Sequence, residues 1–138
     1  MANEFDVWAK VVEIAEGSTA LVSLCGGEAN PLRKWNDIGS GKRPIVAGRI
    51  DDGRILGGSS DPFLWRLTLD VFVEFDSTGQ AAAIADVLEN IITFTNLNST
   101  GGVAAVDVAP TLRNRFPLPE IDEGRDRLTL QWDLRHNR

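Results

Sequence analysis

The sequence predicts an α+β fold: a mostly antiparallel sheet of about four strands with two helices packed on one face. Residues 63–75 and 127–135 alternate strictly between apolar and polar side chains, as strands with one buried face do. Two other segments, before Gly17 and over 81–92, carry apolar residues at helical spacing. Because most of the predicted strands follow one another through hairpins, the order favours a mixed sheet over a parallel α/β sheet.

The opening segment is predicted to be an amphipathic helix that Gly17 ends. Its expected buried stripe is Phe5, Trp8, Val11, Val12 and Ala15. Its expected solvent face carries Glu4, Lys10, Glu13 and Glu16. Residues 18–24 fit either a short second helix or an extended stretch, and the pattern does not decide between them.

The middle of the chain is predicted as loop, strand, turn and long strand. Residues 28–43 show neither period and are expected to form a flexible loop, followed by a short strand over 44–50. Residues 51–62 are expected to form turns and a second flexible loop. The long strand at 63–75 then buries one face, while Arg66, Thr68, Asp70 and Glu74 lie on the face that meets water or a neighbour.

After that strand, Asp76 to Gly79 offer capping oxygens for a helix with Ala81, Ile84, Ala85, Leu88, Ile91 and Ile92 on one stripe. Residues 103–108 are predicted as the third strand, with Pro110 marking its end or an edge position. Residues 109–126, rich in charge and proline, are expected to be a long flexible hairpin connection. The last strand is expected to bury Leu128, Leu130, Trp132 and Leu134.

Composition excludes several classes of function. The chain has 138 residues, which suits a single domain, and a net charge of −6, which argues against a protein that coats nucleic acid. Its apolar runs are too short to cross a membrane, and its N-terminus shows no secretory signal, so we expect a product made in the cytoplasm. One cysteine and one histidine leave no disulfide framework and little scope for His or Cys metal sites, and no cofactor is expected.

The sequence shows no constellation that we interpret as catalytic. Gly39-Ser40-Gly41-Lys42 lacks the upstream glycine and the following Ser or Thr of a phosphate loop. The acidic residues between Glu120 and Asp126 could hold a cation, but interleaved arginines favour a solvated charged loop. Cys25 lies in an apolar stretch and is expected to be an inert buried thiol. We therefore predict that the chain is not an enzyme.

The order and spacing of the elements resemble those of the tail terminator, or tail completion, family of long-tailed bacteriophages. The resemblance covers nearly the whole chain. It is carried by the N-terminal helix with its stop at residues 21–27, the strand beginning Pro44-Ile45-Val46, the strand 65–73, the Ala-rich helix 81–88 and the strand 127–134. The many tryptophans, the lack of tyrosine and the length of the 109–126 excursion depart from the family's pattern.

The resemblance implies a structural virion protein in the tail or neck, a ring and usually a hexamer. Such a ring caps the tail tube, ends its polymerisation and meets the head connector. DNA would pass through without specific binding, which a negative channel favours. Expected channel-facing acids are Asp70, Glu74, Glu120, Asp122 and Glu123, and expected subunit or partner contacts are Arg33, Lys34, Trp35, Arg113, Arg115 and Phe116.

Two alternatives stay open. A head-completion or neck adaptor would meet the portal side rather than the tail tube. A small-ligand-binding domain, or an enzyme built from scattered carboxylates, would be a monomer or dimer with a closed apolar pocket containing convergent polar groups.

Overall fold

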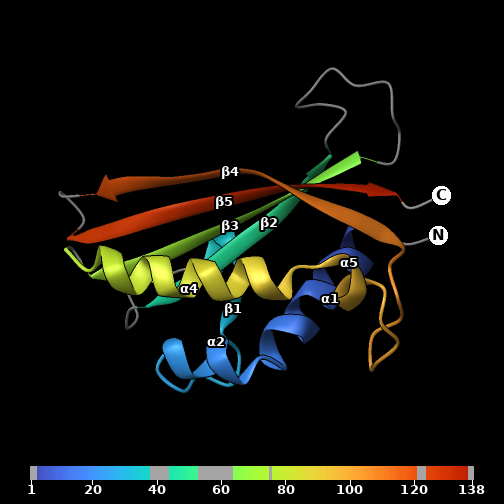
Figure 1. Ribbon diagram of the computed structural model, residues 1–138, viewed down its shortest axis with the longest axis horizontal. Helices are drawn as coiled ribbons and strands as arrows, with labels where there is room; N and C mark the ends of the chain where they lie inside the picture. Colours follow the sequence, from blue (N-terminus) through green and yellow to red (C-terminus); the bar gives the residue numbers. More distant parts are fainter. Residues whose placement is uncertain (1–2, 38–43, 53–63, 75, 121–123, 137–138) are drawn as a thin grey trace.

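The computed structural model describes residues 3–37, 44–52, 64–74, 76–120 and 124–136 (Figure 1). Within these ranges the elements are α1 (Glu4–Glu16), α2 (Thr19–Leu24), β1 (Leu32–Lys34), the 3-10 helix η1 (Trp35–Asp37), β2 (Ile45–Asp52), β3 (Leu64–Glu74), α4 (Thr78–Ile91), α5 (Phe94–Leu97), β4 (Val108–Glu120) and β5 (Arg125–His136). The strand order is β1-β2-β3-β5-β4, and every neighbouring pair is antiparallel except β1 and β2. The predicted α+β class with a mostly antiparallel sheet is confirmed.

The sheet has five strands in the described part of the chain, one more than predicted. The additional strand is β1, which lies inside the segment predicted as a loop over 28–43. It spans three residues, too few to show a period of two, and a parallel partner in β2 holds it in place. Residues 18–24, left undecided by the sequence, form α2, which Ser18 caps by accepting a hydrogen bond from the backbone N–H of Leu21.

The prediction of a flexible connection over 109–126 was wrong, because Val108–Glu120 is the long strand β4, paired along its length with β5. The strand predicted at 103–108 was also wrong, since residues 103–107 precede β4. A register shift between Leu112 and Asn114 breaks the alternation, and Pro110, Pro117 and Pro119 read as loop residues. They are tolerated because β4 is an edge strand, which confirms the edge reading of Pro110.

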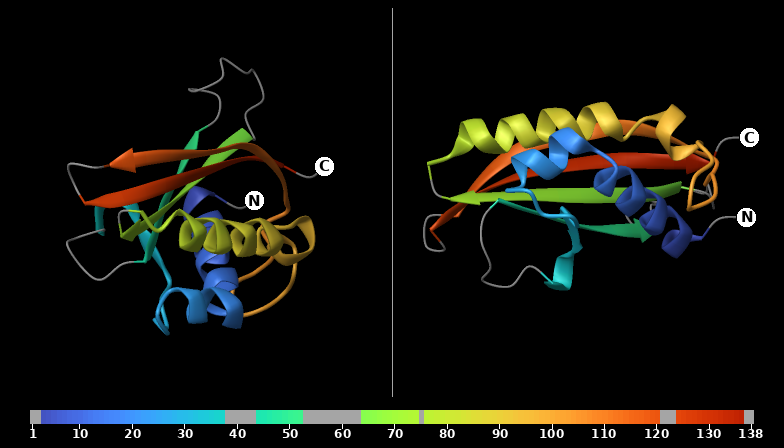
Figure 2. Two further views of the ribbon diagram at one scale, coloured as in Figure 1. Left: turned by 60° about the vertical axis from the view of Figure 1, so that its left-hand side comes forward. Right: turned by 90° about the horizontal axis from the view of Figure 1, so that it is seen from below.

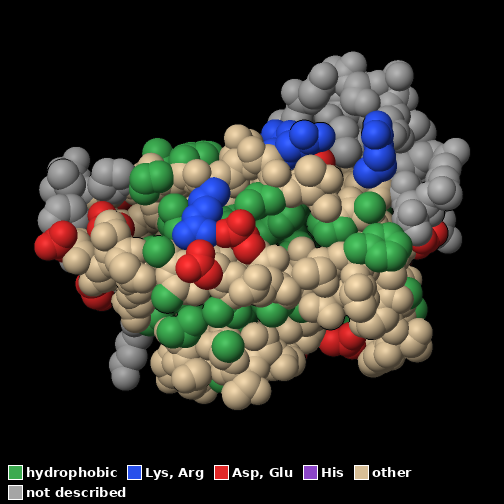
Figure 3. Space-filling model, viewed as in Figure 1, with side chains coloured by type: hydrophobic (Ala, Val, Ile, Leu, Met, Phe, Trp, Pro, Cys, Tyr) green, Lys and Arg blue, Asp and Glu red, His purple; other side chains and the backbone are tan. Residues whose placement is uncertain are grey.

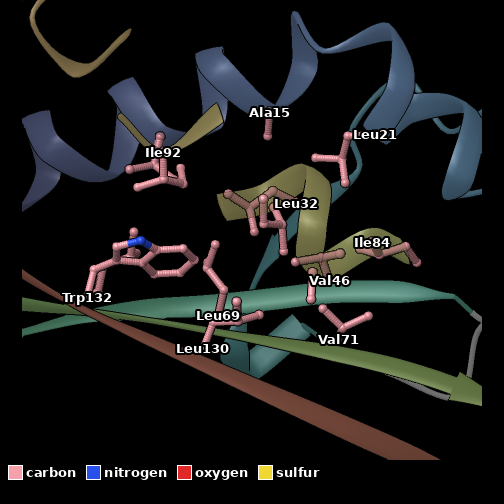
Figure 4. Packing of buried hydrophobic residues seen from close by; sticks show 14 of the residues in the cluster. Ala15, Leu21, Leu32, Val46, Leu69, Val71, Ile84, Ile92, Leu130 and Trp132 are labelled. Atoms are coloured by element: carbon pink, nitrogen blue, oxygen red, sulfur yellow. The ribbon is translucent and has the colours of Figure 1, made fainter. Parts of the chain in front are cut away.

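The helices gather on one face of the sheet, as Figures 1 and 2 show from three directions. Their apolar sides meet the inward face of the strands, and Figure 4 shows Leu69, Val71 and Trp132 pointing from the sheet toward Ile84 and Ile92. The predicted buried faces of β3 and β5 are confirmed at Leu67, Leu69, Val71, Val73, Leu130, Trp132 and Leu134. The core therefore lies between the sheet and the helix layer.

The buried face of α1 differs from the predicted stripe. Val7, Val11 and Ala15, spaced four residues apart, are buried, whereas Phe5 is 70% exposed. The apolar arc of α1 is wide enough for two orientations, and packing against α2, α4 and α5 selects the Val7 side. Gly17 ends the helix as predicted, in a right-handed conformation, and Asn3 and Asp6 form a capping box at its start.

Lys10, predicted to face solvent, is fully buried. Its ammonium donates to Glu13 Oε1 at 2.9 Å, to the carbonyl of Ser99 at 2.7 Å and to the carbonyl of Val103 at 3.0 Å. Glu13 in turn accepts a hydrogen bond from the backbone N–H of Val103. A buried cation needs such partners, and these tie α1 to the connection between α5 and β4.

Candidate assembly surfaces

The face of the sheet opposite the helices carries a small apolar cluster of Ile45, Ala47 and Phe72 that Trp35 covers. Trp35 stands on η1 and meets the ring of Phe72 edge-on at 6.1 Å between centroids. The guanidinium groups of Arg49 and Arg127 lie 5.9 and 6.0 Å from the Trp35 ring centroid. This predicted contact residue thus already packs on its own sheet.

Asp70, predicted to face a channel, is 3% exposed beneath Trp35. Its carboxylate accepts hydrogen bonds from Trp35 Nε1 at 2.7 Å and from the hydroxyl of Thr129. Arg127 Nε lies 3.9 Å from the same carboxylate. The position of Asp70 in the middle of β3 therefore lets it fix η1 on the open face.

Replacing Asp70 with asparagine should lower the free energy of unfolding by about 1.5 kcal/mol, because it removes the charge that both hydrogen-bond donors and Arg127 share. Chemical denaturation at constant m-value measures the change. Asp86→Asn is the control, since the Asp86 side chain is 66% exposed and its ion pair with Arg115 should contribute less than about 0.5 kcal/mol. Equal losses in the two variants would contradict the role given to Asp70.

Of the other predicted channel acids, Glu74 and Glu120 lie at the same end of the sheet, on either side of β5. Glu74 is exposed at the end of β3. Glu120 is half-buried and pairs with Arg125 at 2.8 Å and with Arg127 at 3.3 Å. Asp122 and Glu123 lie outside the described residues. Among the described acids of this set, Glu74 presents its charge most openly.

Further along the open face, Asp133 stands between two arginines. Arg66 and Arg113 each donate to it at 2.8 Å, and the Asp133 side chain is 16% exposed. Burial alone would raise the pKa of this carboxyl, but the hydrogen bonds and charges of the two arginines outweigh burial and lower it. The arginines of the open face thus offset its acids.

The free energy of unfolding should depend on pH through the carboxyl group of Asp133. Its folded pKa lies below the ordinary 3.8, so its contribution is present above that value and is lost as the pH falls through the folded pKa. We expect Asp133→Asn to be less stable than the parent near neutral pH and the difference to shrink toward about pH 2. Denaturation of both proteins across this range tests it, and a gap that does not change with pH would contradict it.

The predicted contact residues lie at opposite edges of the sheet. Arg33, Lys34 and Trp35 belong to β1 and η1 at one edge. At the other edge, on β4, Arg115 bridges to Asp86 and Glu89 of α4, and Phe116 is 37% exposed. Figure 3 shows this side, where hydrophobic side chains reach the surface near β4 and α4. The sequence therefore predicted contact residues at both edges of the sheet, but it did not indicate that the two groups lie at opposite edges.

A groove of about 270 Å³ lies beside β2 at the first edge. Its lining is Glu4, Phe5, Trp8, Lys34, Trp35, Asn36, Gly48, Arg49 and Ile50. Phe5, Ile50 and, on β4, Leu112 were not predicted as contact residues. The 70% exposure of Phe5 contradicts its place in the predicted core stripe, and Leu112 lay in the predicted loop.

The described residues hold no group of three or more His, Cys, Asp or Glu side chains able to bind a metal ion. Cys25 is buried, as predicted, and burial raises the pKa of its thiol to about 11, so the reactive thiolate is scarce at neutral pH. No helix among the described segments is both long and apolar enough to span a bilayer.

Comparison with known proteins finds the same fold in a chain of a solved structure. No protein-family model matches the sequence, and no curated protein matches it. A solved structure, the virion of a native gene transfer agent particle, contains a chain that superposes with a TM-score of 0.64 at 11% sequence identity. The match covers 92% of this chain and 91% of that chain, so the two share the fold over almost their whole lengths.

Proposed function

We propose that this chain is a structural virion protein of a phage-like particle, and that it forms a hexameric ring at the end of the tail tube. The ring stops tube polymerisation and meets the head connector. The observation that carries the proposal is the fold shared with a gene transfer agent virion chain over 92% of this chain and 91% of that one. The order of elements that resembles the tail terminator family supports the finer role.

The proposed ring also assigns a role to the acidic residues of the chain. DNA that passes through a ring is repelled by carboxylates and retained by lysine and arginine, so a negative wall favours passage. Glu74, exposed at the end of β3, is the described residue best placed to contribute, and Glu120 lies across β5 from it, at the end of β4. Asp122 and Glu123, outside the described residues, stay predicted contributors. Asp70 would contribute through its support of η1 rather than as a surface charge.

Tube assembly in vitro tests the role. Tube protein from the same particle is polymerised with and without the purified chain, and tube lengths and ends are measured by electron microscopy. We expect shorter tubes with a ring at one end. Unchanged tubes, together with binding to the head connector alone, would replace the terminator role with that of a neck adaptor. Absence of the chain from purified particles would reject a virion role.

A further inference from the structure

We infer that subunits of this chain join through opposite edges of their sheets, with β4 of one subunit paired antiparallel with the outer edge of β2 in the next. The inference rests on the proposed ring and names the surfaces that would build it. Two different surfaces that meet head to tail form a heterologous interface, which closes into a ring when the rotation allows.

The outer edge of β2 is partly open. β1 pairs with Val46, Ala47 and Gly48, so no described strand covers the outer side of Arg49 to Asp52. Unpaired backbone groups at a sheet edge are a template for a further strand. The groove lies at this point: Ile50 and Trp8 belong to the helix side of the sheet, and Trp35 to the open side.

The edge of β4 is open over a short window. Pro110, Pro117 and Pro119 all pair with even-numbered residues of β5, across the register shift. Proline has no backbone N–H. The hydrogen bonds between β4 and β5 can therefore continue past these prolines only if a backbone N–H at these positions would point away from β5. Leu112 and Arg115 also pair with even-numbered residues of β5, so their N–H groups point away from β5 in the same way. A further strand can therefore pair with β4 only between Pro110 and Pro117.

The stretch between Pro110 and Pro117 carries exposed apolar side chains that would pack against the groove beside β2. Leu112 and Phe116 are 36% and 37% exposed. Leu112 pairs with Trp132 and therefore lies on the helix side, whereas Phe116 pairs with Thr129 and lies on the open side. In a sheet continued into the next subunit, Leu112 would meet Ile50 within the free stretch of β2. Phe116 lies three ladder positions further along β4, past that stretch, and would pack against η1 with its Trp35.

The direction of the strands agrees with this arrangement. β2, β3, β5 and β4 are successively antiparallel, so β4 runs opposite to β2. A neighbouring subunit in the same orientation brings its β4 antiparallel to β2 and keeps its helices on the same side of the sheet. No inversion of the subunit is needed, and a second copy therefore fits the β2 edge.

Disulfide cross-linking tests the pairing in the full-length chain. Ile50→Cys and Leu112→Cys are made singly and together, and the native Cys25 is buried with a poorly ionised thiol. On oxidation, the double variant should give a ladder of covalent multimers. A mixture of the two single variants should give only dimers that contain one copy of each, and each single variant alone should remain uncross-linked.

A second measurement does not depend on disulfide geometry. Phe116→Asp should weaken ring formation at least tenfold in native mass spectrometry. The aromatic ring of Phe116 is 37% exposed, so part of its burial is lost as well, and the unfolding of the variant is therefore compared with that of a control that loses a similar aromatic ring. Phe94→Asp is the matched control, since Phe94 is 47% exposed on α5, outside both edges, and should leave ring formation unchanged.

The outcomes separate the inference from the proposed function. Rings that form in the parent and in Phe116→Asp alike, with no cross-links in the double variant, would overturn the edge pairing and leave the ring intact. Dimers of a single cysteine variant alone would show a two-fold contact and also overturn it. A parent chain that stays monomeric with and without tail tubes, and gives no cross-links, would overturn both.

Discussion

Replacing Lys10 with methionine, which has a similar volume, should lower the free energy of unfolding by about 3 kcal/mol. This is the largest loss that we expect from any substitution that keeps the volume of the side chain. Methionine fills the space but donates no hydrogen bond. The carbonyls of Ser99 and Val103 and the carboxylate of Glu13 would each lose the ammonium that now contacts them at 2.7–3.0 Å. The midpoint of urea unfolding at unchanged m-value measures the loss.

Lys34→Met is the matched control for Lys10→Met. Lys34 is exposed on β1, so the same exchange there should change stability by less than about 0.5 kcal/mol. If both variants lost the same free energy, the buried ammonium would not be a support of the fold. Glu13→Gln should show a smaller loss than Lys10→Met, because Glu13 is partly exposed and a glutamine still accepts hydrogen bonds.

The contrast between Lys10 and β3 shows which parts of this fold a sequence discloses. The helix-facing side of β3 follows from an alternation within eleven residues, so local pattern was enough to predict its burial, whereas the burial of Asp70 on the other face was not predicted. The burial of Lys10 depends on carbonyls that lie 89 and 93 residues further along the chain. In sequence, Lys10 with Glu13 looks like an exposed helical ion pair, and no local signal distinguishes the two cases.

The residues of the candidate surfaces also divide into those that the sequence could predict and those that it could not. Trp35 and Phe116 could be selected from the sequence because both lie in segments without a clear period. The register shift at Leu112 and the prolines of β4 concealed the strand, so the exposure of Leu112 could not be predicted. Strand order is a property of the whole fold, and only the order β1-β2-β3-β5-β4 places the two groups of residues at opposite edges.

Replacing Gly48 with alanine should also cost about 3 kcal/mol of unfolding free energy, at the upper end of the range for overpacking. Gly48 lies within β2, between β1 and β3, where it pairs with Lys34 and Leu69. A Cβ atom there would lie 2.7 Å from the backbone oxygen of Thr68 and would also overlap the side chain of Leu69. Leu69 can rotate, but the Thr68 oxygen is fixed by the strand, so β2 itself must shift. Thermal and urea unfolding measure the cost.

Gly79→Ala separates this steric effect from the general effect of replacing a glycine. Gly79 lies in the first turn of α4, and a Cβ atom there has no contact within 4 Å. Alanine should therefore stabilise the protein by about 0.5 kcal/mol, because it restricts the unfolded chain and favours the helix. Equal and small effects at both positions would show that β2 can move away from β3 freely. A rigid β2 next to the groove is what edge pairing requires, so a large loss at Gly48 with a gain at Gly79 is the result that agrees with a preformed edge.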